Sequence, residues 1–265
     1  MTILHYKIFT PENILFKTRT PLFILHGLLG SLDNWQSQAK YLSQFRPVIT
    51  LDLRNHGNSP HLKGMSYREM YEDVINVAKS KNILIFHLLG HSMGGKVAMQ
   101  LALAKPNMIK SLIVVDIAPK PYPLWHQKTL QGVLSAPLDT FTSRKEINEY
   151  LSTWIENSNE RAFILKNIKQ QTVKNKRQFI WRCNLQEISR GYLKIAGFIS
   201  TQQQYQGKTL FIRGNDSDYI LEADAPLIHS LFPNVEITTI NDSDHLPHIQ
   251  QAIIFQEITQ RFLNK

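Results

Sequence analysis

Short apolar segments alternate along much of the chain with segments of helical periodicity. Continuous apolar runs of this kind are typical of strands that are buried on both faces of a parallel sheet. Residues 3–9 alternate between apolar and polar positions instead, which predicts an antiparallel edge strand, and residues 13–17 are expected to pair with it. The pattern predicts an α/β fold with a mostly parallel central sheet flanked by helices. The expected buried strands are residues 21–25, 47–51, 83–89, 111–116, 209–214 and 235–240.

The helices between these strands are indicated by apolar residues at helical spacing. In one of them Met70, Val74 and Val77 share a face, and Ser66 with Glu69 has the spacing of a capping box at its start. The other expected helices are residues 34–45, 96–104, 223–231 and 249–263.

The alternation of strand and helix stops after the strand that ends at Asp116 and resumes near residue 206. The intervening sequence is rich in helical pattern, proline and aromatic residues, enough to pack a small subdomain. We therefore expect a core formed by residues 1–117 and 206–265, with residues 118–205 inserted as a helical cap. Such a cap would cover the ends of the strands.

The excess of positive charge is concentrated in this insertion. The chain has a net charge of +9, and residues 117–200 contain thirteen Lys or Arg against six Asp or Glu. A basic region can attract an anionic substrate, a lipid surface or nucleic acid, although a solvated surface is the more common explanation. Because the chain contains no recognised nucleic-acid motif, we expect no nucleic-acid partner.

The single cysteine, Cys183, excludes an internal disulfide framework and fits a reducing compartment. The first residues lack the pattern of a signal peptide, and no apolar run approaches the ~20 residues of a transmembrane helix. We therefore expect a cytoplasmic protein without stable membrane insertion, either a monomer or a homodimer.

The most informative motif is Gly-x-Ser-x-Gly at residues 90–94, placed between an expected strand and an expected helix. This arrangement is that of a nucleophile elbow, in which a sharp strand-to-helix turn exposes the serine hydroxyl. Side chains at Gly90 and Gly94 would crowd such a turn. Ser92 is therefore the candidate nucleophile.

A serine nucleophile needs a base and an acid that orients the base. His245, in the loop after the last expected strand, is the preferred base, and His248 is its nearest competitor. We expect His91 to pack beneath the elbow. The spacing leaves the acid open among Asp116, Asp216 and Asp218.

Four segments together resemble the α/β-hydrolase superfamily over nearly the whole chain, and within it the YbfF-type bacterial esterases. In most of that superfamily the acid stands at the position of Ser217, whereas the YbfF-like subgroup also has serine there. The resemblance therefore implies that Asp116 is the acid and that Ser217 is an additional hydrogen-bond partner of His245. The matching segments are residues 26–35, 52–59, 90–96 and 115–119.

Two backbone N–H groups, those of Leu28 and Met93, are expected to form the oxyanion hole. Residues 52–59 are expected to form a structural hydrogen-bond network beside the site. Asp244 stands where the superfamily usually has glycine, and we expect its carboxylate to raise the pKa of His245.

The predicted function is a serine hydrolase that needs no cofactor and no metal. The resemblance implies hydrolysis of carboxylic esters with short to medium acyl chains, and of acyl-CoA thioesters, through a Ser-His-Asp triad and an acyl-enzyme. The basic cap would suit the phosphates of CoA. Alternatives on the same fold are haloperoxidase-like proteins and hydrolases of C–C bonds or amides, and a non-catalytic binding protein is a further alternative.

Overall fold

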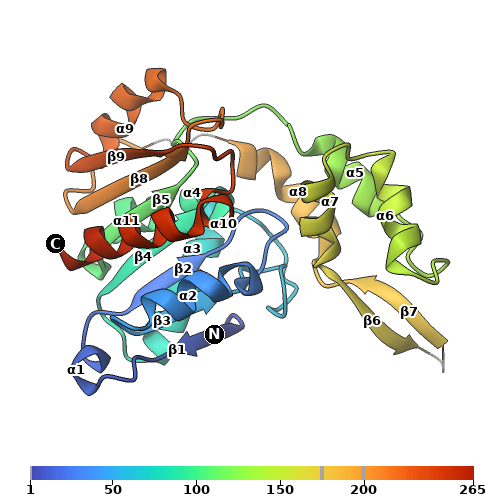
Figure 1. Cartoon of the computed structure of the whole chain (residues 1–265), viewed down its shortest axis with the longest axis horizontal. Coiled ribbons are helices and arrows are strands. Elements are labelled where there is room, and N and C mark those ends of the chain that lie inside the picture. The colour runs from blue at the N-terminus through green and yellow to red at the C-terminus, as the bar shows by residue number, and fades with distance from the viewer. Residues whose placement is uncertain (1, 174–175, 198–200) are drawn as a thin grey trace.

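The computed structural model describes residues 2–173, 176–197 and 201–265. Outside the described residues lie Met1 and two short stretches of the expected cap, residues 174–175 and 198–200. Within the described ranges the core is a seven-stranded sheet in the order β1-β3-β2-β4-β5-β8-β9 (Figure 1). All neighbouring strands are parallel except β1 and β3. The mostly parallel sheet is therefore confirmed. The strands are β1 (Tyr6–Phe9), β2 (Leu22–Leu25), β3 (Val48–Leu51), β4 (Phe86–His91), β5 (Ile109–Val115), β8 (Lys208–Gly214) and β9 (Val235–Ile240).

Helices cover both faces of this sheet. Successive residues of one strand point to opposite faces, so that Phe23 and Leu25 belong to one apolar cluster and Leu22 and Ile24 to another. The first cluster includes apolar residues of α3 (Tyr67–Ser80), α4 (Met93–Ala104) and α9 (Ala225–Leu231). The second includes those of α2 (Gln36–Leu42) and α11 (Ala252–Asn264). The continuous apolar runs of the sequence are thus explained by burial on both faces.

Local sequence signals explain several element boundaries. The capping box at α3 is present, because the Ser66 hydroxyl accepts from the Glu69 N–H and the Glu69 carboxylate accepts from the Ser66 N–H. The expected strand at residues 13–17 is wrong. Asn13 caps a single helical turn there, α1 (Ile14–Lys17), and β1 pairs with β3 instead. The remaining short helices are η1 (Leu32–Trp35), η2 (Pro106–Met108), η3 (Glu222–Asp224) and α10 (Pro247–Gln250).

The segment between β5 and β8, residues 118–205, is called the cap segment below. Its helices are α5 (Gln127–Ser135), α6 (Arg144–Ser152), α7 (Ser158–Leu165) and α8 (Leu185–Ala196). It also contains an antiparallel hairpin of β6 (Ile168–Val173) and β7 (Lys176–Trp181), which extends away from the sheet in Figure 1. The expectation of an all-helical insertion missed this hairpin, because β-branched and aromatic residues such as Ile168 and Trp181 pair across it among basic and polar ones. The division into core and cap domains stays a prediction.

Over the described ranges, with their gaps at residues 174–175 and 198–200, no helix combines the length and the apolar composition needed to cross a bilayer.

Candidate active site

Ser92 lies in the sharp turn between β4 and α4. Its backbone has φ 52° and ψ −120°, a left-handed conformation that is rare and costly for a residue other than glycine. The flanking glycines are required by space. A Cβ atom at Gly90 would lie 2.2 Å from the Gly94 carbonyl oxygen, and one at Gly94 would lie 2.5 Å from the His26 carbonyl oxygen. The turn therefore has the geometry that the motif predicts.

The structure brings the three candidate residues of the triad together. The Nε2 atom of His245 lies 3.0 Å from the Ser92 Oγ, and its Nδ1 atom lies 2.8 Å from Oδ2 of Asp116. Asp116 follows the last residue of β5, and its side chain is fully buried. Its Oδ1 atom accepts from the Gly214 N–H at 3.1 Å, and Oδ2 accepts from the Ser217 hydroxyl. This carboxylate is thus held on two sides while it faces the imidazole.

The competing residues lie elsewhere. Asp216 and Asp218 are exposed. The imidazole of His248 is buried against the Trp35 ring at a centroid distance of 4.1 Å. One expectation is corrected, because the Ser217 hydroxyl contacts Asp116 and not His245. Ser217 follows the end of β8 and Asp116 follows the end of β5. Because these two strands are neighbours in the sheet, the Ser217 hydroxyl lies beside the Asp116 carboxylate.

Burial sets the protonation of this group of residues. It lowers the pKa of His245 below its usual value of 6.5 and raises the pKa of Asp116. The charge of Asp244 raises the pKa of His245, as expected, but burial lowers it by more. The expected net rise of this pKa is therefore wrong. A neutral imidazole is the form that can accept a proton from serine.

His245 is held in place from two sides. The ring of Tyr219 stacks on its imidazole at a centroid distance of 3.6 Å, and Nε2 of His91 lies 2.7 Å from its carbonyl oxygen. His91 is therefore buried and contacts the loop that carries His245, and its packing beneath the elbow stays a prediction. Tyr219 was not predicted, since an isolated aromatic residue two positions after Ser217 carries no sequence signal for stacking.

The loop that carries Leu28 approaches the serine closely. A Cβ atom at Gly27 would lie only 3.2 Å from the Ser92 Cβ. Met93 is the first residue of α4, and an N–H group at this position has no acceptor within its own helix. Both backbone positions therefore lie close to the serine. That their N–H groups form the oxyanion hole stays a prediction.

Residues 52–59 fasten this loop, as expected. The N–H of Leu29 donates to Nε2 of His56 at 3.2 Å, and the N–H of Leu32 donates to Oδ1 of Asp52 at 2.8 Å. Burial lowers the pKa of His56 to about 3, so its ring is neutral and can accept such a bond. The predicted structural network beside the site is confirmed.

The cap segment adds a contact that the sequence did not reveal. The buried Asn167 donates from its side-chain amide to the Leu29 carbonyl, and its Oδ1 lies 3.3 Å from the thiol of Cys183. Cys183 itself is buried, and burial raises the pKa of its thiol to about 12. The cap segment is thus joined directly to the loop beside Ser92.

Comparison with known proteins assigns the family. The family described as "alpha/beta hydrolase fold" matches residues 20–252. The chain belongs to the α/β-hydrolase family. A solved structure titled "Marine microorganism esterase" is similar with a TM-score of 0.92 and 37% identity, over 99% of this chain and 100% of that one.

Two named relatives agree with this assignment. The "sn-1-specific diacylglycerol lipase ABHD11" of Danio rerio is 37% identical over 89% of this chain and 76% of its own length. The "Esterase YbfF" of Escherichia coli is 27% identical over 92% of this chain and 93% of its own length, which supports the predicted resemblance. These similarities support a hydrolase of the esterase or lipase type.

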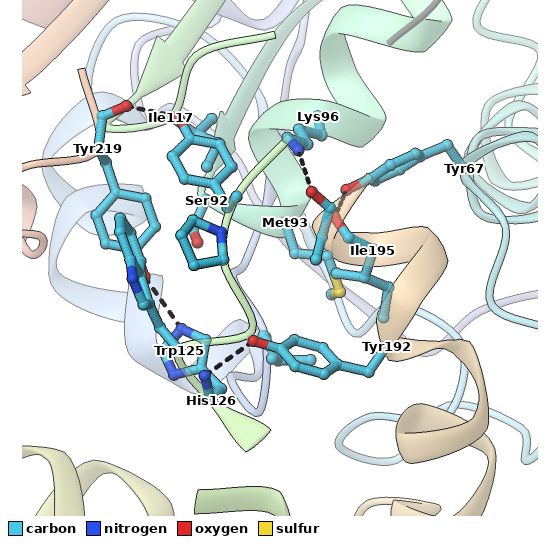
Figure 2. A pocket seen from close by; sticks show the side chains of 14 residues that line it. Tyr67, Ser92, Met93, Lys96, Ile117, Trp125, His126, Tyr192, Ile195 and Tyr219 are labelled. Atoms are coloured by element: carbon cyan, nitrogen blue, oxygen red, sulfur yellow. Dashed lines mark hydrogen bonds between the residues drawn. The ribbon is translucent and has the colours of Figure 1, made fainter. Parts of the chain in front are cut away.

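Among the described residues of this hydrolase, two cavities share Ser92, Leu28, His126 and Tyr219. The smaller cavity has a volume of about 40 Å³ and is also lined by Met93, Lys96 and residues of α3 and α8 (Figure 2). The larger cavity has a volume of about 230 Å³ and is also lined by His91, His245 and residues of α5 and α7. The candidate nucleophile therefore lies where two cavities of unequal size meet.

Lys96 is a buried cation at the smaller cavity. Its ammonium group donates to the carbonyls of Lys120 at 2.7 Å, Gly197 at 2.5 Å and Ala196 at 3.4 Å, which belong to the beginning and the later part of the cap segment. Figure 2 shows it beside the Tyr67 and Ile195 pair, where the tyrosine hydroxyl donates to the Ile195 carbonyl. Burial lowers the pKa of Lys96 to about 7. Nothing in the sequence distinguishes it from a surface lysine of an amphipathic helix.

In the part of the chain that the structure describes, His, Cys, Asp and Glu side chains form no group of three or more that could hold a metal ion.

Proposed function

We propose that this chain is a serine esterase that hydrolyses carboxylic esters through an acyl-enzyme, with Ser92 as nucleophile, His245 as base and Asp116 as orienting acid. The observation that carries the proposal is the continuous relay from Ser92 Oγ to His245 Nε2 at 3.0 Å and from His245 Nδ1 to Asp116 at 2.8 Å. Both distances are within hydrogen-bonding range. The esterase and lipase names of the relatives point to the same chemistry.

Each step follows from this geometry. His245 accepts the proton of Ser92 as the oxygen attacks the ester carbonyl carbon, and the N–H groups of Leu28 and Met93 donate to the resulting oxyanion. The imidazolium then gives its proton to the departing alcohol. Asp116 holds the ring in the tautomer that has its proton on Nδ1, and a water molecule, activated by the same imidazole, releases the acid.

Carboxylic esters with short to medium acyl chains are the proposed substrate class, and acyl-CoA thioesters are a second candidate. The basic charge of residues 117–200 favours the second candidate, since CoA carries phosphates. Hydrolysis of an acyl-CoA should then slow with added salt more than hydrolysis of a neutral ester with the same acyl group. An equal salt response of the two substrates would reject the role of the basic cap segment.

A fluorophosphonate probe tests the nucleophile. The wild type should be labelled on Ser92, and Ser92→Ala should lose both labelling and esterase activity. Ser80→Ala is the matched control, because that hydroxyl bonds the Val77 carbonyl at the end of α3. Absence of labelling in the wild type, or labelling that survives in Ser92→Ala, would reject the proposal.

A substrate panel separates esters from the alternatives on this fold. An amide and a ketone with the same acyl group are assayed beside the ester, and halogenating activity is assayed separately with a halide and hydrogen peroxide. The proposal expects the ester to have the highest kcat/KM. A higher value for one of the other substrates would replace the proposed reaction while leaving the triad in place.

A further inference from the structure

The position of the base determines on which side of Ser92 the leaving group departs. In the proposed mechanism the alcohol oxygen takes its proton from Nε2 of His245, so the alcohol must lie on the side of that imidazole. The acyl carbon is bonded to Ser92 at that moment, and its remaining chain must extend in another direction. The two cavities at Ser92 can therefore be assigned to the two halves of an ester.

Over the described residues, only one of the two cavities is lined by the base. His245 belongs to the larger cavity, together with Leu246 from the same loop. The described lining of the smaller cavity lacks His245 and contains Met93, whose N–H is the proposed oxyanion donor. The alcohol thus corresponds to the cavity of about 230 Å³ and the acyl chain to the cavity of about 40 Å³.

We infer that this site takes esters in which a short acyl group is joined to a larger alcohol that carries no negative charge within the cavity. This inference rests on the proposed function. The smaller cavity, at about 40 Å³, has less than a fifth of the volume of the larger one, at about 230 Å³, which suits an acyl group that is short relative to the alcohol. The Tyr67–Ile195 and Lys96–Ala196 hydrogen bonds join residues that line this cavity, between the core and the cap segment.

The restriction on the charge of the alcohol follows from the larger cavity. Its lining includes two acidic residues, the half-buried Glu160 and the exposed Asp244, and none of its described lining residues is Lys or Arg. The Glu160 carboxylate accepts from the Thr129 hydroxyl at 2.9 Å, and Nδ1 of His126 lies 4.0 Å from it. Burial lowers the pKa of His126, so at neutral pH its ring does not offset the carboxylate. The residues that line this cavity therefore carry a net negative charge although the protein as a whole is basic.

Two isomeric esters test the assignment of the cavities. Hexyl acetate and ethyl hexanoate have the same atoms, but the long chain lies on the alcohol in the first and on the acid in the second. We expect kcat/KM to be about tenfold or more higher for hexyl acetate, the scale at which pockets discriminate by size. A smaller ratio, or the reverse order, overturns the inference.

Two variants make the test reciprocal. Ile195 lines the smaller cavity, and Phe163 lines the larger one. Ile195→Ala should raise kcat/KM for ethyl hexanoate relative to hexyl acetate, and Phe163→Ala should not. The reciprocal substrate is the acetate of a branched alcohol, for which Phe163→Ala should raise kcat/KM relative to ethyl acetate. If the two variants act on the opposite substrates, the assignment is reversed.

The restriction on the charge of the alcohol is tested with two acetate esters, acetoxyacetate, whose alcohol part is an anion, and acetoxyacetamide, whose alcohol part is neutral. In the wild type, kcat/KM should be about threefold or more higher for acetoxyacetamide than for acetoxyacetate, and Glu160→Gln should reduce that ratio. An unchanged ratio in the variant overturns the restriction on charge. Failure of the proposed function is distinguishable, because it would abolish fluorophosphonate labelling, whereas failure of this inference changes only the order of substrates.

Discussion

The substitution Asp116→Asn probes the least predictable member of the candidate triad, and its structural consequence can be worked out. The carboxylate accepts hydrogen bonds from the Gly214 N–H, the Ser217 hydroxyl and Nδ1 of His245. An asparagine has the same shape but replaces one oxygen by an NH₂ group. Because the Gly214 N–H can only donate, the amide oxygen should remain there, and the NH₂ group should face Ser217 and His245.

An NH₂ group opposite Nδ1 reverses the tautomer of the imidazole. The ring must then accept at Nδ1 and carry its proton on Nε2, which is the atom that has to accept the proton of Ser92. In serine proteases with the same triad, this change lowers kcat by ~10⁴-fold. We expect a similar loss here, about 5 kcal/mol of transition-state stabilisation.

The assay is the initial rate of p-nitrophenyl acetate hydrolysis, with thermal unfolding measured on the same samples to confirm that the variant folds. Asp216→Asn is the matched control, because this exposed acid lies close to the usual position of the acid in the superfamily. It should leave kcat within about twofold of the wild type. A loss below about tenfold in a folded Asp116→Asn protein, or an equal loss in the control, would refute the reasoning.

Three further predictions follow from burial and close packing. Burial lowers the pKa of His245, so kcat/KM should decline only as the pH falls below 6.5; a midpoint of this acid limb at or above 6.5 would contradict the stated cause. Gly94→Ala should destabilise the fold by ~2–3 kcal/mol or more in denaturant unfolding, because its Cβ would lie 2.5 Å from a backbone oxygen; a change under ~0.5 kcal/mol would be inconsistent with that packing. Burial lowers the pKa of Lys96 to about 7, whereas the unfolded lysine titrates near 10.5, so the unfolded state binds more protons between these values. The free energy of unfolding should therefore rise with pH over this window more steeply in the wild type than in Lys96→Met, and equal slopes would show that Lys96 is not the cause.

Much of the fold could be predicted from local pattern. Strands buried on both faces, such as β2 and β4, are continuous apolar runs, and α3 has its capping box in the sequence. The segment at residues 13–17 and the hairpin β6–β7 could not be predicted in this way. Both are short, and their state depends on a cap by Asn13 and on pairing across the hairpin rather than on a long periodic pattern.

The residues of the candidate site also differ in how far local sequence identifies them. Ser92 was identifiable because its geometry is made by its immediate neighbours, Gly90 and Gly94, within one turn. Spacing left Asp116, Asp216 and Asp218 open, and the family resemblance implied Asp116. The contact itself depends on the fold, since Asp116 is 129 residues from His245 and reaches it through the order of β5, β8 and β9. The position of Ser217 against Asp116, and not against His245, also depends on that order.

The sequence by itself determined the succession of strands and helices, the strained turn at Ser92 and the loop beside it, because these depend on residues close together in the chain. Only the tertiary structure placed Asp116 against His245, a contact that spacing had left open and the family resemblance had implied. It alone decided that Tyr219 stacks on the His245 ring and that Lys96 joins two parts of the cap segment. It also decided that the cavities at Ser92 are unequal and that the residues lining the larger one carry a net negative charge in a basic protein. Burial, pKa and cavity shape arise from segments brought together over long sequence distances, and no local pattern encodes them.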